Sequence, residues 1–435
     1  MDNINNIKID NLGPAEFNSP FSLPGIDFID DCERVFIPAL QQEVETYVQA
    51  GKAVPSLERG GPRLKMFFKP QETTACIVTC GGLCPGINDV IRSIVLTLYN
   101  SYGVRRILGA RYGFEGLIES FGHGFLELNP QVVKGINERG GSILASSRGY
   151  QDVSQTVDTL VKHKINILFT IGGDGTQRGA HDLVQEIHKR NLKIAVVGIP
   201  KTIDNDVLYV DQTFGFVSAV HACRVNILAA HEEAQGVKNG IGIVKLMGRD
   251  SGFIAAHASV ANSVVNFCLI PELPFELNVV GGLLQKLEER LKKKSHAVIV
   301  VAEGAGQHLI PPQPQEKDAS GNIKHHDIGI FLKNEIDRHF KVKNIPVNIR
   351  YIDPSYTIRV IPTGSVDSIL CTEFGMMAVH AAMAGKTDMI IGRRNNYAVH
   401  VPIPLAVAAR RKLDFQSSVF QTLISSTIPV ALRQF

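Results

Sequence analysis

Short apolar runs alternate with amphipathic segments from about residue 70 onward. Most of the runs are rich in β-branched residues, and several end in glycine. Runs of this length and composition predict buried strands. Segments such as RGAHDLVQEIHKRNL and VVGGLLQKLEERLKKK have helical periodicity and lie between the runs. Strands alternating with helices predict an α/β fold whose parallel sheets are covered on both faces. The runs are TACIVTC (74–80), RRILGA (105–110), INILFTIGG (165–173), KIAVVGIP (193–200), GIGIVKLMG (240–248), NFCLIPE (266–272) and HAVIVVAEGAG (296–306).

Other parts of the chain lack this alternation. Residues 1–70 carry scattered proline and glycine, so we expect an N-terminal extension with one helix around Val35–Ala50. The polar stretch at 311–326 predicts a loop or hairpin before the helix DIGIFLKNEIDRHF.

Composition narrows the class of protein. With 435 residues, 44% of them hydrophobic, the chain is long enough for two or three domains with sizeable cores. A net charge of +3, without a basic tract interleaved with aromatics, argues against a nucleic-acid partner. No run of eighteen apolar residues exists and the N-terminus is polar, so we expect no membrane association and a cytoplasmic location.

The seven cysteines lie mostly in apolar runs. We therefore expect buried free thiols in a reducing compartment. Cys76, Cys80 and Cys84 are evenly spaced, but they span a strand and a glycine turn, which does not favour a metal site.

Glycine-rich turns follow several of the predicted strands, at the edge where parallel sheets bind ligands. In CGGLCPGINDVIR, Gly82 and its neighbours would let a phosphate approach backbone N–H groups, although structural glycines also occur in such turns. In GGDGT, Asp174 stands among glycines. A carboxylate beside a phosphate needs a cation between them, so Asp174 is a candidate Mg²⁺ ligand, with an ordinary turn or N-cap residue as the alternative.

PKTIDND, after the next predicted strand, carries two acids and a lysine. Asp204 and Asp206 are spaced to share one side of an extended turn, where one can accept a proton while the other is held by a cation. Lys201 adds a positive charge suited to phosphoryl transfer. An Asx-rich loop is the alternative.

Three arginines occur in or beside apolar stretches. Arg249 follows a predicted strand in KLMGRDSGFIA, a position suited to gripping phosphate. Arg350 and Arg359 bracket YIDPSYTIR, which contains Tyr356. Solvated surface charges are the alternative for the last two.

In combination these motifs resemble the phosphofructokinase family over residues 70–410. The chain is most similar to the plant and trypanosomatid ATP-dependent branch, which is related to the pyrophosphate-dependent enzymes. The motifs that carry the resemblance are CGGLCPGIND, SSRG, GGDGT, PKTIDND, LMGR, PE, AEGAGQ and YTIR.

The resemblance implies ATP-dependent 6-phosphofructokinase activity, the Mg²⁺-assisted transfer of a phosphoryl group to the 1-hydroxyl of fructose 6-phosphate. It implies Asp204 as general base, with Thr202 and Lys201 also catalytic and Asp174 holding the metal. The implied ATP-binding residues are Gly82, Arg148, Gly173, Gly175, Thr176 and Gly179. The implied fructose 6-phosphate-binding residues are Thr202, Asp204, Asp206, Met247, Gly248, Arg249, Glu272, Arg350, Tyr356 and Arg359.

At two positions, this chain can be compared with other branches of the phosphofructokinase family. Bacterial ATP-dependent members carry an arginine where this chain has Gly240, so Arg249 and Arg350 would do more of the sugar-phosphate binding. Pyrophosphate-dependent relatives usually carry aspartate at the position of Gly175, together with the lysine matched by Lys201. A carboxylate at 175 would crowd and repel the nucleotide α-phosphate, so glycine favours ATP, with pyrophosphate as the alternative donor.

Other functions are disfavoured. NAD kinases and lipid kinases also carry GGDGT, but they are not known for PKTIDND or LMGR. A non-catalytic regulatory paralogue would be expected to lose Asp174, Thr202 or Asp204, and all three are present.

The fold that the resemblance implies is two doubly wound, Rossmann-like lobes. The nucleotide lobe is expected at 71–215 with 359–410 and the sugar-phosphate lobe at 216–358, with 1–70 as an extension and 411–435 as a tail. Arg350 would reach a neighbour's site, so a homotetramer is favoured over a homodimer.

Overall fold

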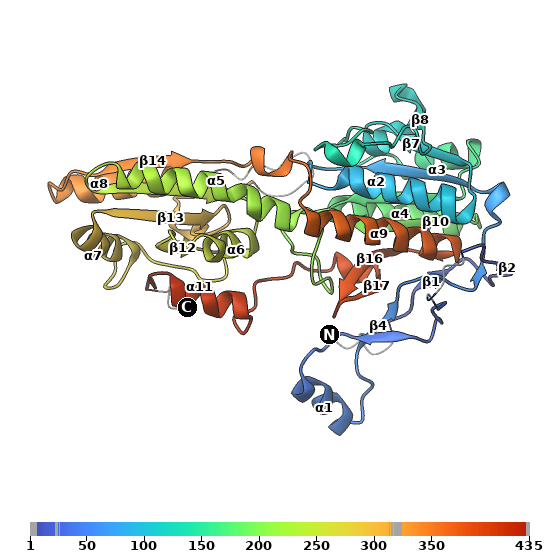
Figure 1. Cartoon of the computed structure of the whole chain (residues 1–435), viewed down its shortest axis with the longest axis horizontal. Coiled ribbons are helices and arrows are strands. Elements are labelled where there is room, and N and C mark those ends of the chain that lie inside the picture. The colour runs from blue at the N-terminus through green and yellow to red at the C-terminus, as the bar shows by residue number, and fades with distance from the viewer. Residues whose placement is uncertain are drawn as a thin grey trace. The chain divides into compact units, whose positions relative to one another are not determined.

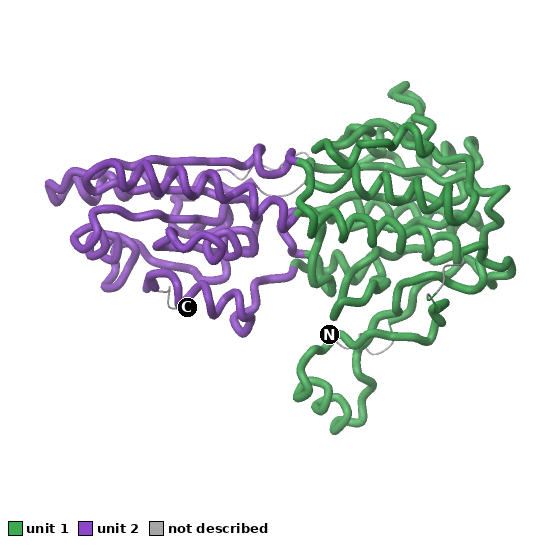
Figure 2. The backbone as a smooth tube through the Cα atoms, viewed as in Figure 1, with its two compact units in different colours: residues 1–202, 207–215, 362–410 green, residues 203–206, 216–361, 411–435 purple. Residues whose placement is uncertain are grey.

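The computed structural model describes residues 7–21, 25, 27–312, 314, 316 and 324–431. It divides into two compact units (Figure 2). Unit 1 comprises Met1–Thr202, Val207–Gly215 and Pro362–Arg410, and unit 2 comprises Ile203–Asp206, Phe216–Ile361 and Arg411–Phe435. The chain therefore passes between the units five times: after Thr202 inside the PKTIDND motif, and after Asp206, Gly215, Ile361 and Arg410. Most of the loop predicted at 311–326, and the extreme ends of the expected extension and tail, lie outside the described residues.

Unit 1 is built on a nine-stranded sheet (Figure 1). Its central strands β16, β10, β9, β6 and β7 run parallel, and antiparallel strands flank them on both sides. This confirms the α/β fold with a mostly parallel sheet. In spatial order the strands are β3 (Arg34–Phe36), β4 (Ser56–Arg59), β17 (Tyr397–Pro402), β16 (Met389–Arg394), β10 (Ala195–Pro200), β9 (Ile167–Gly172), β6 (Thr74–Thr79), β7 (Arg106–Ala110) and β8 (Phe125–Glu127).

Helices cover the central strands of this sheet on both faces. Strands β6, β9 and β10 are buried at every position, which explains why their sequences are continuous apolar runs rather than alternating ones. On one face Val78, Leu168 and Val196 pack in a core cluster with Leu160 and Leu183. The last two belong to the mutually packed helices α3 (Val153–Lys162) and α4 (Asp174–Lys189), and a second packed pair is α2 (Ile87–Leu96) with α9 (Ser365–Met383).

Unit 2 contains a smaller, wholly parallel sheet of four strands. Its order is β12 (Phe267–Leu269), β13 (His296–Ala302), β11 (Gly240–Leu246) and β14 (Asn348–Ile352), which leaves β14 at one edge. Helix α11 (Ser418–Ser426), from the expected tail, packs on α6 and groups with this unit. The helices around the sheet are α5 (Phe216–Gln235), α6 (Phe253–Ala261), α7 (Leu283–Lys294) and α8 (Ile328–Val342).

The N-terminal segment is more integrated into unit 1 than its composition indicates. The expected helix around Val35–Ala50 is shorter, because Val35 lies in β3 and α1 spans only Gln41–Gln49. Pro38 and the extended backbone of Leu40 prevent an earlier start. Short strand pairs also involve this segment: β1 (Asp10–Asn11) pairs with β15 (Lys386–Thr387), and β2 (Phe17–Asn18) pairs with β5 (Lys65–Met66).

The cysteines are free thiols, and five of them are buried as expected. Burial raises the pKa of Cys76, Cys80 and Cys223 to about 12, so these thiols stay protonated near neutral pH. Cys32 differs because it is exposed.

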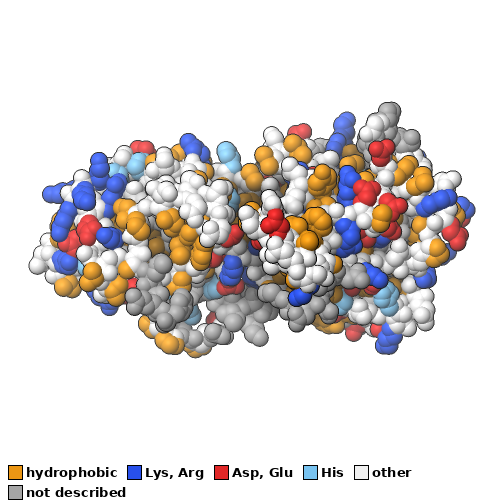
Figure 3. Space-filling view, turned by 90° about the horizontal axis from the view of Figure 1, so that it is seen from below, with side chains coloured by type: hydrophobic (Ala, Val, Ile, Leu, Met, Phe, Trp, Pro, Cys, Tyr) orange, Lys and Arg blue, Asp and Glu red, His pale blue; other side chains and the backbone are white. Residues whose placement is uncertain are grey.

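The described helices include none that is long and apolar enough to cross a membrane. On the face drawn in Figure 3, acidic and basic side chains are interspersed with apolar ones. The small net positive charge is therefore not gathered into one basic patch on that face.

A buried ion network attaches the N-terminal segment to the sheet of unit 1. Glu58 on β4 is 5% exposed and lies 3.1 Å from both Arg63 Nη2 and Lys386 Nζ. Its oxygen is also 3.0 Å from His400 Nδ1. Asp31 completes the network by pairing with Arg63 and Lys386. Burial alone would raise the pKa of Glu58, but the His400 hydrogen bond and the two cations outweigh it and lower that pKa.

We expect Glu58→Gln to destabilise the protein strongly, because it leaves Arg63 and Lys386 facing the single carboxylate of Asp31. Removing one partner from a buried ion pair costs about 3 kcal/mol or more, which corresponds to a fall of roughly 6–12 °C in the thermal midpoint of a unit this size. Differential scanning calorimetry measures this. Glu33→Gln, which removes the half-exposed pair with Arg59, is the control and should move the midpoint little. Equal shifts in the two variants would contradict the prediction.

Candidate functional site

Four turns meet at the carboxyl edge of the sheet in unit 1. The backbone N–H of Lys201, just after β10, donates to the carbonyl of Gly172 at the end of β9, at 3.0 Å. Cys80, just after β6, donates to Ile171 at 3.0 Å, and the next residue, Gly81, donates to Ser147 at 2.9 Å. The motifs CGGLCPG, SSRG, GGDGT and PKT, separated by up to 120 residues in sequence, are therefore neighbours.

The GGDGT motif is the start of helix α4 rather than a free turn. Gly173 is the N-cap and Asp174 is the first helical residue, at the positive end of the helix dipole. Gly172 cannot carry a side chain, because a Cβ there would lie 2.2 Å from Thr176 Oγ1. Gly175 has no such constraint, since a Cβ there would meet nothing within 4 Å. Packing within the described chain thus requires glycine at 172 but not at 175.

Asp174 forms an ion pair with an arginine that the sequence patterns did not single out. Its Oδ2 lies 3.3 Å from Arg410 Nε, and both side chains are about one-fifth exposed. Among the residues that the structure describes, no group of three or more His, Cys, Asp or Glu side chains forms a metal cage. A single carboxylate fits Mg²⁺ that arrives with phosphates, because Mg²⁺ commonly takes only one or two protein carboxylates and fills its remaining positions with phosphate and water.

The other residues that the sequence predicts for the site at this edge of the sheet differ in how deeply they are buried. Lys201 is 6% exposed, and its Nζ donates to the Gly82 carbonyl at 2.6 Å, which places a positive charge in the first glycine turn. The Thr202 carbonyl accepts from Thr213 Oγ1 at 2.8 Å. Arg148 is exposed. A Cβ at Gly179 would lie 3.5 Å from the ring of Phe114, which is ordinary contact.

The second half of PKTIDND belongs to unit 2. Asp204 and Asp206 are 8% and 5% exposed, and Asn205 between them has a left-handed φ of +57°. Asp204 Oδ2 lies 3.8 Å from Arg249 Nε, so a cation balances the buried carboxylate. Ser251 Oγ donates to the Asp204 carbonyl at 3.5 Å.

The turn after β11 places Arg249 next to these acids. Gly248 and Arg249 have φ of +138° and +49°, and the Arg249 N–H donates to Glu303 Oε1 at 2.9 Å. Glu303, from AEGAGQ, therefore stabilises a conformation that is unfavourable for arginine. Glu272 Oε1 accepts 3.0 Å hydrogen bonds from Gly252 N–H and Leu413 N–H, so this predicted site residue also joins backbone segments.

The remaining predicted residues lie at or beyond strand β14. Arg350, on this edge strand, is exposed and pairs with Glu233 at 3.2 Å. Arg359 lies over the ring of the exposed Tyr356, 4.7 Å from its centroid. Met247 is half-buried before the Gly248 turn.

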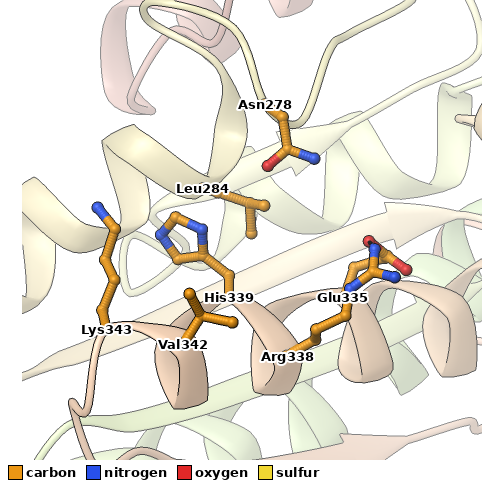
Figure 4. A pocket seen from close by; sticks show the side chains of 7 residues that line it. All are labelled: Asn278, Leu284, Glu335, Arg338, His339, Val342 and Lys343. Atoms are coloured by element: carbon orange, nitrogen blue, oxygen red, sulfur yellow. Dashed lines mark hydrogen bonds and ion pairs between the residues drawn. The ribbon is translucent and has the colours of Figure 1, made fainter.

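A separate cavity of about 230 Å³ lies between α7 and α8 (Figure 4). It contains none of the predicted site residues. Three of its charged groups are already paired: Arg338 and Glu335 with each other, and Lys343 with Glu288. Its lining residues are Asn278, Leu284, Glu335, Arg338, His339, Val342 and Lys343.

Glycine turns, a helix N-terminus and a lysine at the carboxyl edge of a parallel sheet are features of an α/β phosphate-binding protein. Residues 74–382 match the family model described as phosphofructokinase. The chain therefore belongs to the phosphofructokinase family.

Individual relatives are similar to this protein over nearly the whole chain. The chain is 47% identical to the ATP-dependent 6-phosphofructokinase of Borreliella burgdorferi, over 98% of this chain and 97% of that one. It is 42% identical to the ATP-dependent 6-phosphofructokinase of Trypanosoma cruzi, over 97% and 87%. These matches confirm the resemblance to the ATP-dependent branch that includes trypanosomatid enzymes.

A solved structure shares the fold. A pyrophosphate-dependent phosphofructokinase from Marinobacter aquaeolei matches with a TM-score of 0.65 and 18% identity, over 83% of this chain and 93% of that one. At that identity the match bears on the fold and not on the phosphoryl donor.

Proposed function

We propose that this protein is an ATP-dependent 6-phosphofructokinase. It transfers the γ-phosphoryl group of ATP to the 1-hydroxyl of fructose 6-phosphate, giving fructose 1,6-bisphosphate and ADP in glycolysis. The observation that carries the proposal is the identity of 42–47% to relatives of that name over nearly the whole chain. Asp174, Thr202 and Asp204 are all present, which supports an active enzyme.

The proposed donor site lies on unit 1. Gly82, Gly173 and Thr176 would place backbone N–H groups and a hydroxyl around the phosphates, at the N-terminus of α4. Lys201 and the exposed Arg148 supply positive charge there. Mg²⁺ held by Asp174 would neutralise the negative charge of the donor phosphates. The remaining glycines of this proposed site are Gly175 and Gly179.

Within this proposal, Asp204 accepts the proton of the sugar 1-hydroxyl as the new P–O bond forms. Its burial excludes water from the carboxylate, and Arg249 at 3.8 Å balances its charge. Thr202 lies beside the transferred group, and Lys201 stabilises the negative charge that gathers on it. Asp206, Met247, Gly248, Arg249, Glu272, Tyr356 and Arg359 bind the sugar phosphate.

ATP is the proposed donor because of Gly175. The space around this position is open, so nothing in its described surroundings demands glycine. A requirement to admit the nucleotide α-phosphate explains the missing side chain. Pyrophosphate is the alternative donor, since Lys201 suits either.

We also propose a homotetramer, with a homodimer as the alternative. Arg350 is exposed on an edge strand, which is consistent with a residue that serves a neighbouring subunit. A cytoplasmic location is proposed because seven free thiols are typical of a reducing compartment.

Asp204→Ser should lower kcat by about 10²- to 10⁴-fold with little change in KM for either substrate, because it removes the proton acceptor and leaves the binding groups in place. A coupled assay of the purified protein with ATP and fructose 6-phosphate measures this. Asp182→Ser, which changes an exposed aspartate on α4, is the matched control and should leave kcat unaltered. Comparable activity in Asp204→Ser would remove the general-base assignment, and an inactive wild-type protein would refute the proposed function.

Gly175→Asp should lower kcat/KM for ATP by at least about tenfold through repulsion of the α-phosphate. The variant should fold, because the position is open and an acid is favourable in the first turn of a helix. Gly175→Asn has nearly the same size without the charge, so a smaller loss in that variant would identify repulsion rather than crowding as the main cause. Measuring both variants with ATP and with pyrophosphate tests the choice of donor. Unchanged use of ATP by Gly175→Asp, or a wild-type preference for pyrophosphate, would contradict it.

A further inference from the structure

Four consecutive residues, Arg410–Leu413, each contact a different element of the proposed site. Arg410 pairs with Asp174 in unit 1. In unit 2, Arg411 binds the turn that follows Asp204, and Lys412 Nζ donates to the carbonyl of Asp250. The Leu413 N–H donates to Glu272. The segment lies beyond the family match, which ends at residue 382.

Arg411 makes several contacts with the turn that carries Asp204 and Asp206. Its Nε and Nη2 donate to the Asn205 carbonyl at 3.2 and 2.8 Å, and its own N–H donates to the Asp206 carbonyl at 2.8 Å. The guanidinium also stacks over Phe253, 4.6 Å from the ring centroid. One side chain therefore joins helix α6 to the turn that bears both buried acids.

The Asp204–Asp206 turn reverses through a left-handed residue. Asn205 has a φ of +57°, a conformation that asparagine tolerates better than most residues other than glycine. A charged donor fork on the Asn205 carbonyl fixes the plane of the peptide between Asn205 and Asp206. It thereby limits rotation of the chain next to Asp204.

We propose that Arg411 is a positioning residue of the phosphoryl-transfer site, holding the Asp204–Asp206 turn in its reactive conformation from the Arg410–Leu413 segment. This rests on the proposed function for Asp204. Arg411 acts through the Asn205 carbonyl and not on substrate, so its loss should affect the rate more than substrate binding.

The test compares Arg411→Met and Arg411→Lys with the wild-type full-length protein. Arg411→Met should lower kcat about 10- to 100-fold, the effect expected when a catalytic group is displaced by about 1 Å, with KM for both substrates within about threefold of wild type. Arg411→Lys keeps one charged donor for the Asn205 carbonyl and should have an intermediate kcat. If the methionine variant fails to fold, kcat of the lysine variant still tests the proposal.

Arg290→Met is the matched control. Arg290 is also half-buried in unit 2 and donates to a backbone carbonyl, that of His296, at the amino end of β13. If Arg411 had a purely structural role, Arg411→Met and Arg290→Met would both alter the thermal midpoint, and neither would change kcat of the folded protein.

A second measurement does not depend on activity. Hydrogen exchange of the peptide covering residues 203–207 should be faster in Arg411→Met than in wild type and unchanged in Arg290→Met. Wild-type kcat in Arg411→Met, or a lowered kcat with unchanged exchange at 203–207, would overturn the proposal. If the wild-type protein does not phosphorylate fructose 6-phosphate, the proposed function fails. Independently of activity, unchanged hydrogen exchange at 203–207 in Arg411→Met would show that Arg411 does not support the turn.

Discussion

The hydrogen bond from the Lys201 N–H to the Gly172 carbonyl joins the ends of two central parallel strands, and the arrangement of unit 1 depends on this alignment. Because β9 and β10 pair in register along their whole length, both glycine- and acid-bearing turns leave the sheet at the same level. Helix α4 then starts immediately, with Asp174 at its first position. Parallel pairing thus brings motifs that are separated in sequence to the same edge of the sheet, where their backbone N–H groups lie close together.

Pairing of buried charge is the second constraint. An isolated ion inside a protein is too costly to persist, and three of the largely buried acids considered above have a cation nearby. Asp174 has Arg410, Asp204 has Arg249, and Glu58 has Arg63 and Lys386. The acids of the first two pairs, Asp174 and Asp204, are proposed to meet Mg²⁺ and the sugar hydroxyl. Each could exchange its arginine partner for these groups when the substrates bind. The Glu58 network joins the N-terminal segment to Lys386 and His400 in unit 1, and it thereby attaches a segment whose composition alone would not predict a sheet.

The sequence predicted the strands β6, β7, β9, β10, β11, β12 and β13, because their continuous apolar runs are local patterns, but it did not predict β3, β4, β8, β14, β16 or β17. Continuous apolar runs located the ends of β6, β9, β10 and β11 to within two residues. The contacts of Arg410, Arg411 and Glu303 were not predicted. Each depends on a partner far away in the chain, and the two arginines of ARRKL have no local pattern that distinguishes them from solvated charges. The strand at Val35 was missed for the same reason, since its partner strand is β4, twenty residues later.

One boundary between the two units falls inside a motif of the proposed site. The boundary falls between Thr202 and Ile203, so Thr202 and Asp204 belong to different units. Consecutive Cα atoms are about 3.8 Å apart, so two peptide links keep these residues within about 7 Å whatever the arrangement of the units. The same reasoning applies between Arg410 and Arg411, which contact the two acid-bearing turns and are joined by a single peptide bond. On the proposed function, covalent continuity therefore limits the separation of Thr202 from the proton acceptor Asp204.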